Sequence, residues 1–255
     1  MIYKTVLVTG ASSGIGKAIA ELLAEQGVTL ILLARRRDKL IELSKVLQSK
    51  TSCYVCECDL ADTHSINAAI DKIPQDFANI DGLINCAGAA LGLGTAQEAD
   101  WSDWQAMINI NCMGLACLTH RLLPKMVAKN KGHIINIGST AGNYPYKGGN
   151  VYAASKAFVQ QLTLNIKADL LGTAVRVSNI EPGMVSDSEF SLVRFKGDTD
   201  KASAVYEGIE ALSSVDIANT VLWVLTQPAH VNINKIELMP INQAPQRTAF
   251  HRETS

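Results

Sequence analysis

The chain has 255 residues, of which 47% are hydrophobic and 18% charged, so it is long and apolar enough to bury a sizeable core. Its formal net charge of −1 gives no basis for a nucleic-acid or anionic-membrane partner and favours a small-molecule or protein partner. The sequence runs directly into an apolar strand-like segment and holds no apolar run long enough to span a bilayer, which predicts a cytoplasmic protein.

Short apolar runs alternate with longer amphipathic runs along the whole chain. The expected strands are 5–9, 29–34, 53–58, 82–85, 133–137, 176–180 and 233–238, and the expected helices are 14–26, 38–49, 63–73, 102–129, 151–171 and 214–226. Most strands are apolar at successive positions, as when helices cover both faces of a sheet. The alternation predicts a single α/β domain over residues 1–255, with a doubly wound, Rossmann-like parallel sheet of about seven strands.

Two segments lie outside this alternation. Residues 183–208 form a long polar stretch after a strand end, where open α/β sheets bind ligands, so we expect a substrate loop there. Residues 243–255 form a polar C-terminal tail.

Three of the six cysteines, Cys53, Cys56 and Cys58, fall in one strand-like run. In a strand, Cys53 faces opposite to the other two, and no second pair of ligands follows. We therefore interpret them as buried thiols that stay reduced, and we predict no metal site.

The first strand is followed by a glycine-rich turn that opens the first helix. The spacing of its glycines is G-x-x-x-G-x-G, and the strand–turn–helix context is the one in which a backbone approaches a pyrophosphate at a helix N-terminus. We expect the coenzyme to contact Gly10, Ser12, Ser13, Gly14, Ile15 and Gly16.

The same turn also matches G-x-S-x-G, the nucleophile elbow of α/β hydrolases. A hydrolase would need a histidine and an acid at strand ends later in the chain. His64, His120 and His133 fall within or beside expected helices and strands, and His230 and His251 have no obvious acid partner. Hydrolysis is therefore the weaker interpretation.

The second strand ends in Ala34 followed by Arg35, Arg36 and Arg37. In a dinucleotide-binding fold this strand end meets the adenosine ribose, where an acid favours NAD and arginines pair with the 2′-phosphate of NADP. Arg35 and Arg36 therefore favour NADP.

Tyr152 and Lys156 lie four residues apart at the start of a helix-forming run, so they face the same way one turn apart. A neighbouring ammonium favours the phenolate, so we expect Lys156 to lower the pKa of Tyr152. Ser139 ends an apolar strand thirteen residues earlier, and its hydroxyl could reach the same pocket.

Together these stretches resemble the short-chain dehydrogenase/reductase family in its single-domain branch. The resemblance covers the whole chain and is carried, in order, by Thr9–Gly16, Asn85-Cys86-Ala87-Gly88, Asn111, Ser139, Tyr152, Lys156 and Pro182-Gly183. It implies that Tyr152 is the general acid/base, that Lys156 holds the nicotinamide ribose, that Ser139 binds the substrate oxygen and that Asn111 anchors a proton-carrying water.

The resemblance also implies further coenzyme contacts. The implied contacts are Asp59 and Leu60 near the adenine, Asn85, Ala87 and Gly88 beside the adenosine, and Pro182, Gly183, Met184 and Val185 beside the nicotinamide. One departure is Cys86, which stands where the family usually has asparagine and cannot supply the hydrogen bonds of an amide.

Finer features are similar to the NADP-dependent serine and 3-hydroxy acid dehydrogenases, which oxidise small acids such as serine, allo-threonine and 3-hydroxypropionate. Among them are the segments 144–146, 148–152, 193–198 and 229–234. Arg194 is the best candidate for the substrate carboxylate, because a guanidinium pairs with it bidentately, and Lys196 is a weaker one.

Two alternatives stay open at this point. The chain could reduce neutral ketones, aldehydes or quinones within the same fold, or it could be a regulator that binds NADP without turnover. The helix at 151–171 is more apolar than one sheet-covering face requires, and the resembled family commonly forms tetramers, so we also expect a homotetramer.

Overall fold

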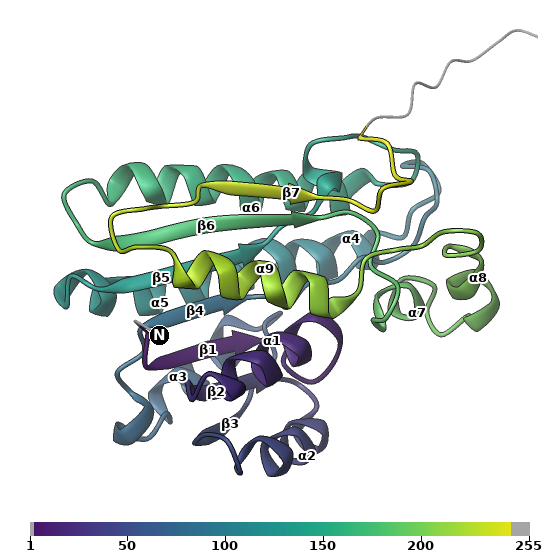
Figure 1. The fold of residues 1–255 in the computed structure, drawn as a ribbon. Helices are drawn as coiled ribbons and strands as arrows, with labels where there is room; N and C mark the ends of the chain where they lie inside the picture. Colours follow the sequence, from purple (N-terminus) through teal and green to yellow (C-terminus); the bar gives the residue numbers. More distant parts are fainter. Residues whose placement is uncertain (1–2, 246–255) are drawn as a thin grey trace, which may run out of the picture.

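The computed structural model describes residues 3–245, which form a seven-stranded parallel sheet with helices on both faces (Figure 1). The strands are β1 (Thr5–Thr9), β2 (Thr29–Ala34), β3 (Cys53–Glu57), β4 (Gly82–Asn85), β5 (Gly132–Ile137), β6 (Val175–Pro182) and β7 (Lys235–Leu238). Their order in the sheet is β3-β2-β1-β4-β5-β6-β7. The predicted fold class is confirmed.

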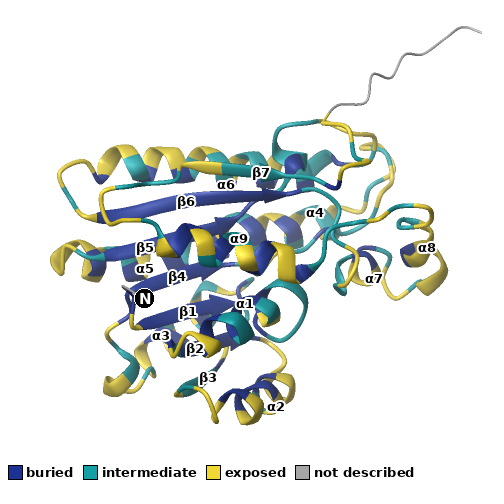
Figure 2. Ribbon diagram, in the orientation of Figure 1, coloured by how far each residue is buried: buried dark blue, intermediate teal, exposed yellow. Residues whose placement is uncertain are grey.

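Two layers of helices enclose the sheet. One face is covered by α1 (Gly14–Glu25), α2 (Arg37–Leu47) and α9 (Ser214–Thr226), and the other by α3 (Thr63–Asp71), α5 (Leu115–Ala128) and α6 (Asn150–Asp169). Figure 2 shows the inner strands as the most continuously buried part of the fold, whereas the two edge strands, β3 and β7, are only partly buried. Such burial on both faces explains why the strands are apolar at successive positions.

Side chains along each strand alternate between these two layers. Val6 and Val8 pack in the core under α1 and α9, while Leu7 packs in the core under α3 and α5. The cysteines of the third strand region follow the same rule, because Cys53 contacts the first core and Cys56 belongs to the second. The expected opposite orientation of these thiols is confirmed.

The order of the strands reverses between β1 and β4, which lie side by side. The connections after these two strands leave in opposite directions, and a crevice opens at such a switch point. Gly10 lies at the end of β1 with φ +67°, and a Cβ atom there would lie 3.1 Å from the backbone nitrogen of Ala87, which follows β4. Glycine is needed because the two chain segments approach so closely.

Two expected elements differ in detail. The helix expected over 102–129 consists of α4 (Trp101–Ile108), a π-helical turn η2 (Asn109–Gly114) and α5. The segment expected as a loop over 183–208 contains α7 (Phe190–Arg194) and α8 (Thr199–Ala204), which lie beyond the C-terminal ends of the strands (Figure 1). The described residues also form two short 3₁₀ helices, η1 (Gln75–Phe77) and η3 (Thr140–Gly142).

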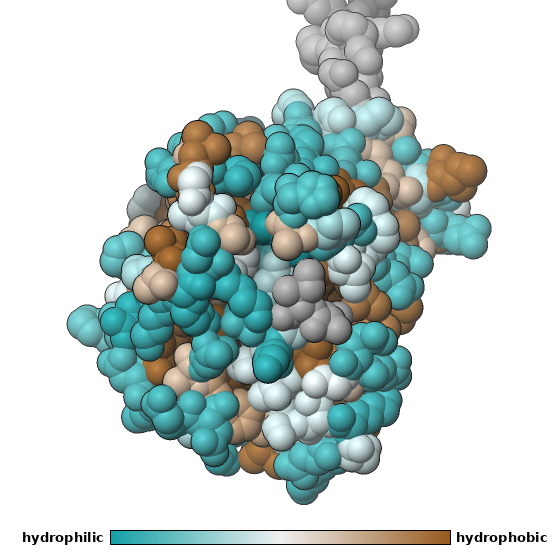
Figure 3. Space-filling model, turned by 60° about the vertical axis from the view of Figure 1, so that its left-hand side comes forward, coloured by the Kyte–Doolittle hydropathy of each residue, from teal (hydrophilic) through white to brown (hydrophobic). Residues whose placement is uncertain are grey.

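On the face shown in Figure 3, hydrophobic residues are interspersed among hydrophilic ones. Within residues 3–245, no helix has both the length and the apolar character needed to cross a membrane. Most of the predicted polar tail, including His251, lies outside the described residues.

Candidate active site

A cavity of about 300 Å³ lies at the switch point, between the turn after β1 and the ends of β2, β3 and β4. Most of the residues predicted to contact the coenzyme line it: Gly10, Ser12, Ser13, Gly14, Ile15, Gly16, Arg35, Arg36, Asp59, Leu60, Ala87 and Gly88. The N-cap residue of α1, Ser13, makes no side-chain hydrogen bond to the first amides of the helix. Those amides and the helix dipole therefore remain available to an anion such as a pyrophosphate.

Close packing around the turn requires small residues. A Cβ atom at Gly16 would lie 2.5 Å from the carbonyl oxygen of Gly10, so even alanine would collide with the backbone. Gly14 has φ +51°, and a Cβ atom there would lie 2.9 Å from Cβ of Ser188. The turn thus fits a ligand that needs direct access to the backbone.

Asn85 is the exception among the predicted coenzyme contacts, because it does not line this cavity. Its side-chain amide is buried under α5 and donates to Thr119 Oγ1 at 3.2 Å and to Asn136 Oδ1 at 2.8 Å. As the last residue of β4, it points into the layer between sheet and helices. Its side chain therefore has a structural role, and a contact between Asn85 and the adenosine stays a prediction that would involve its backbone.

A second cavity of about 430 Å³ adjoins the first, and its walls include most of the residues predicted to act in catalysis and substrate binding. It is lined by Ser139, Tyr152, Lys156, Pro182, Gly183, Met184, Val185 and Arg194. The two cavities share part of their walls, namely Ile15, Cys86, Gly88, Ser188 and Phe190. A dinucleotide in the first cavity would therefore extend into the second.

Tyr152 lies on the first turn of α6 and is 8% exposed. Burial raises the pKa of Tyr152 to about 12, although its hydrogen bond with Ser139 acts in the opposite direction. The sequence-based prediction was a lowered pKa for Tyr152, because it considered the nearby ammonium of Lys156 and not the loss of hydration on burial. Ser139 lies two residues after the C-terminal end of β5, and its Oγ accepts from the backbone nitrogen of Ala141 at 3.1 Å.

Lys156 lies one turn further along α6, with its ammonium buried 5.9 Å from the centre of the Tyr152 ring. Nζ donates to the carbonyl oxygen of Ile137 at 2.8 Å. Burial lowers the pKa of Lys156 to about 8. The hydrogen bond to Ile137 thus holds the ammonium beside the tyrosine. Gly88 packs close to this ammonium, since a Cβ atom at Gly88 would lie 3.4 Å from Nζ.

Asn111 belongs to the π-helical turn η2 and is buried. Its Oδ1 accepts from the backbone nitrogen of Ala89 at 2.9 Å, and its Nδ2 donates to the carbonyl oxygen of Ala89 and to Oγ of Ser155, each at 2.9 Å. Its side chain therefore links the segment after β4 to the helix that carries Tyr152. π-Helical turns are often found at functional sites.

Arg194, at the end of α7, is only 9% exposed. Its Nε donates to the carbonyl oxygen of Gly92 and its Nη2 to the hydroxyl of Tyr146, each at 3.0 Å. The guanidinium carbon lies 5.7 Å from the centre of the Tyr152 ring. Within residues 3–245, Arg194 forms no ion pair with a carboxylate, so a buried cation lines this cavity without a counter-ion.

Lys196, the weaker candidate, does not line the larger cavity. Its ammonium lies 3.0 Å from a carboxylate oxygen of Asp103, and its side chain is 59% exposed. It is therefore a paired surface charge.

Comparison with known proteins agrees with this geometry. The short chain dehydrogenase family matches residues 4–196. This chain belongs to that family. It is 48% identical to an NADP-dependent 3-hydroxy acid dehydrogenase of Escherichia coli strain K12 over 97% of this chain and 99% of the relative. It is 42% identical to sulfoacetaldehyde reductase 2 of Chromohalobacter salexigens, over 97% of this chain and 98% of that one.

Among solved structures, the chain is similar to the closed form of a serine dehydrogenase complexed with NADP⁺. The two share 47% sequence identity with a TM-score of 0.94, and the match covers 98% of this chain and 100% of the other.

In this short-chain dehydrogenase, Ser12 has no arrangement typical of a hydrolase nucleophile. Its Oγ accepts from Nε and Nη2 of Arg36 at 3.2 and 3.0 Å. Among residues 3–245, no histidine lines either cavity, and His133 is buried in the sheet beside Ser178. The hydrolase interpretation of the G-x-S-x-G pattern therefore lacks its general base.

Several residues around the site received no role from the sequence. Tyr144, Tyr146, Phe190 and Gln243 line the larger cavity, and the Phe190 ring lies 5.6 Å from that of Tyr152. Tyr144 and Tyr146 belong to a segment that marked the resemblance to hydroxy acid dehydrogenases, which was the available signal. Phe190 lies in the segment 183–208 that was expected to be a substrate loop, but no signal marked this residue or Gln243 individually, because long-range packing brings them to the site.

Proposed function

We propose that the chain is an NADP-dependent dehydrogenase that interconverts the 3-hydroxyl and 3-oxo groups of small acids, of the serine, allo-threonine and 3-hydroxypropionate class. The observation that carries this proposal is the buried Arg194 in the same cavity as Tyr152. A buried cation without a counter-ion is costly, and a substrate carboxylate would supply the missing charge. The named relatives act on acids of this kind, according to their descriptions.

The proposed coenzyme is NADP(H), because the end of β2 presents Arg36 and no acidic residue. Ala34 occupies the last strand position, and the guanidinium of Arg36 is oriented by the hydroxyls of Ser12 and Ser13. A guanidinium held in this way is suited to the 2′-phosphate of the adenosine ribose. The relatives whose names include NADP support the same choice.

In oxidation, bound NADP⁺ would supply the nicotinamide that accepts a hydride from the carbinol carbon. Tyr152 would take the hydroxyl proton while the C–O bond becomes a carbonyl, and it would return the proton in reduction. Ser139 would donate a hydrogen bond to the same oxygen, and Arg194 would hold the carboxylate at the other end of the substrate. Lys156 would place a positive charge beside the phenolate. Asn111 would anchor a water molecule that carries the proton onward.

A neutral carbonyl compound is a weaker candidate for the substrate, because it would leave Arg194 buried without a counter-ion. A non-catalytic NADP-binding regulator is also weaker, because Asn111, Ser139, Tyr152 and Lys156 would then have no role as a set. Both alternatives make distinct predictions in one assay.

That assay follows the absorbance of the reduced nicotinamide with purified protein, NADP⁺ or NAD⁺, and a panel of matched alcohols. We expect NADP⁺ reduction with L-serine, L-allo-threonine or 3-hydroxypropionate and much slower turnover of the neutral amide of 3-hydroxypropionate. Faster turnover of neutral substrates would refute the acid assignment. NADP(H) binding in calorimetry without turnover of any substrate, in either direction, would favour the regulator.

We also propose that the chain forms a homo-oligomer through α4, η2 and α6, and we expect a tetramer because the family commonly forms one. Large hydrophobic side chains are exposed on these elements, namely Trp101, Ile108, Met113, Phe158 and Leu164. Burial of such side chains between subunits would be favourable. Light scattering at micromolar concentration tests this, and a monomer would contradict it.

For localisation, we propose the cytoplasm. The six cysteines are all free, as expected in a reducing compartment. Fractionation of the source cells, with immunodetection of the native protein, would test the proposal.

A further inference from the structure

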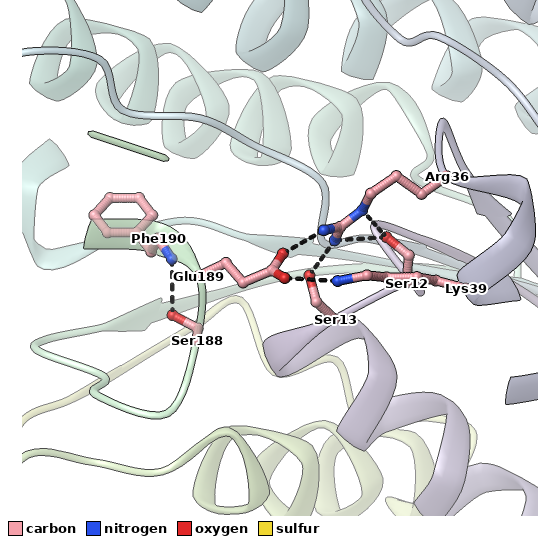
Figure 4. Close-up of polar contacts among 7 residues, drawn as sticks. All are labelled: Ser12, Ser13, Arg36, Lys39, Ser188, Glu189 and Phe190. Carbon is pink, nitrogen blue, oxygen red and sulfur yellow. Dashed lines mark hydrogen bonds and ion pairs between the residues drawn. The ribbon is translucent and has the colours of Figure 1, made fainter. Parts of the chain in front are cut away.

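Residues 183–208, called the substrate segment below, contribute a carboxylate that binds Arg36 and Lys39, two cations that follow β2. Glu189 directly precedes α7, yet its Oε2 lies 2.6 Å from Nη1 of Arg36 and its Oε1 lies 2.8 Å from Nζ of Lys39 (Figure 4). The two partners lie on either side of the start of α2, and Lys39 is 150 positions away in the sequence. Both oxygens of the carboxylate therefore bind cations of the coenzyme-binding half.

The groups around Glu189 form a set suited to a phosphate. Arg36 also donates from Nη2 to the hydroxyls of Ser12 and Ser13, at 3.0 and 2.7 Å, so its guanidinium is fixed in place. The hydrogen bonds from Lys39, Arg36 and Ser13 lower the pKa of Glu189 to about 2, so the carboxylate is charged at neutral pH. A guanidinium, an ammonium and hydroxyls are also the usual ligands of a phosphate monoester.

The position of Glu189 links the two cavities. It lines the smaller cavity together with Arg36, while Phe190, the next residue, packs against Tyr152, and Arg194 lines the larger cavity at the end of the same short helix. Because Glu189 directly precedes α7, release of its carboxylate from Arg36 and Lys39 removes two ion pairs that tie the segment carrying Phe190 and Arg194 to the start of α2.

We propose that Glu189 is an internal competitor of the coenzyme's 2′-phosphate for Arg36 and Lys39. The inference rests on the proposed function, since it takes Arg36 as the site of that phosphate. A phosphate carries more negative charge than a carboxylate and has more acceptor oxygens, so it displaces Glu189. NAD(H), which lacks the phosphate, leaves the Glu189–Arg36 ion pair intact.

The proposal gives Glu189 two effects. It weakens the binding of NADP(H), because each binding event first breaks two ion pairs. It also makes the substrate segment respond to the phosphate of the coenzyme, because only NADP(H) releases the segment from α2. Glu189 would therefore be a positioning residue that distinguishes the two coenzymes.

The test is a set of dissociation constants from calorimetry for NADPH, NADH, 2′,5′-ADP and 5′-AMP. For Glu189→Gln we expect NADPH and 2′,5′-ADP to bind about three- to tenfold more tightly, as when two half-exposed ion pairs no longer have to be broken. NADH and 5′-AMP should bind with unchanged affinity. The matched control is Glu207→Gln, an exposed carboxylate of the same segment without a side-chain partner among residues 3–245.

Other outcomes separate the possible errors. Weaker binding of all four ligands to Glu189→Gln would mean that Glu189 closes over the coenzyme, and unchanged binding would mean that it has no role; either would overturn the proposal. Arg36→Gln tests the underlying assignment. If it weakens NADPH no more than NADH, the proposed phosphate site itself is wrong.

A second measurement reads out the segment directly. In hydrogen exchange, we expect NADP⁺ to increase exchange, relative to NAD⁺ at saturation, at the amide of Val193, which donates to the carbonyl oxygen of Glu189 at 2.9 Å. We expect this difference to disappear in Glu189→Gln. Equal exchange with both coenzymes in the wild-type protein would overturn the coupling to the segment.

Discussion

Replacement of Arg194 by methionine is the most direct test of how the site recognises a substrate. Methionine keeps an unbranched stem between the rings of Tyr146 and Tyr152, where the guanidinium now lies 5.5 and 5.7 Å from the ring centres. The change therefore removes the charge and the hydrogen-bond donors while it preserves much of the packing.

The size of the effect follows from the donors that remain available. Nε and Nη2 already donate to Gly92 and Tyr146, whereas Nη1 of Arg194 has no partner within residues 3–245. A hydrogen bond that involves a charged group contributes about 1.5–3 kcal/mol, which corresponds to roughly a 10- to 150-fold loss. We expect this loss in kcat/KM for serine and 3-hydroxypropionate, mainly through KM.

The assay measures kcat/KM by NADP⁺ reduction with 3-hydroxypropionate and with its neutral amide. Lys196→Met is the control, since Lys196 is exposed and paired with Asp103; it should leave both substrates nearly unaffected. If Arg194→Met slows the acid and the amide by the same factor, the carboxylate argument fails and the arginine has a packing role instead.

Three further outcomes are expected. Tyr152→Phe should lower kcat by about 10²- to 10⁴-fold, as for loss of a general acid/base, without changing the dissociation constant of NADPH in calorimetry; turnover within tenfold of wild type would argue against proton transfer by the phenol. Gly16→Ala should abolish NADPH binding or lower the melting temperature sharply, because its Cβ would lie 2.5 Å from the Gly10 oxygen, whereas Gly94→Ala, whose nearest contact would be 3.7 Å, should be tolerated in both measurements. Burial lowers the pKa of Lys156 to about 8 from its usual 10.5, so the folded chain loses this proton before the unfolded chain, and the wild type should gain stability relative to Lys156→Met as the pH rises from about 8 to 10.5. Urea unfolding at several pH values tests that sign, and parallel curves for the two proteins would refute it.

The sheet with its two helix layers, the glycine-rich turn and the Tyr152–Lys156 pair could be predicted because each depends on a local sequence pattern. The strands of the sheet are apolar at successive positions, and the glycines after β1 meet a local steric requirement. Tyr152 and Lys156 are brought together by helix geometry alone. Each of these patterns spans only a few neighbouring residues, so it can be recognised without knowledge of the tertiary structure.

What could not be predicted depends on packing between distant segments. The raised pKa of Tyr152 results from burial, which the sequence of α6 does not reveal. The burial of Arg194 depends on its contact with Gly92, and the position of Glu189 depends on a contact with α2. The direction of the Asn85 side chain was not predictable either, because a polar residue at a strand end can face either the ligand or the layer under a helix.

The π-helical turn Asn109–Gly114 also changes how the long helix is used. Before it, Met107 of α4 packs with Ala90 and Tyr152; after it, Leu118 of α5 packs in the core beneath the sheet. In a continuous α-helix, eleven residues rotate through almost complete turns, so Met107 and Leu118 would point the same way. The π-helical turn inserts about one residue and so shifts the direction of the following side chains by about 100° around the helix axis. The consecutive helices α4 and α5 can therefore contribute side chains to two different hydrophobic cores. Deletion of a single residue there would restore regular geometry at the expense of one of those cores.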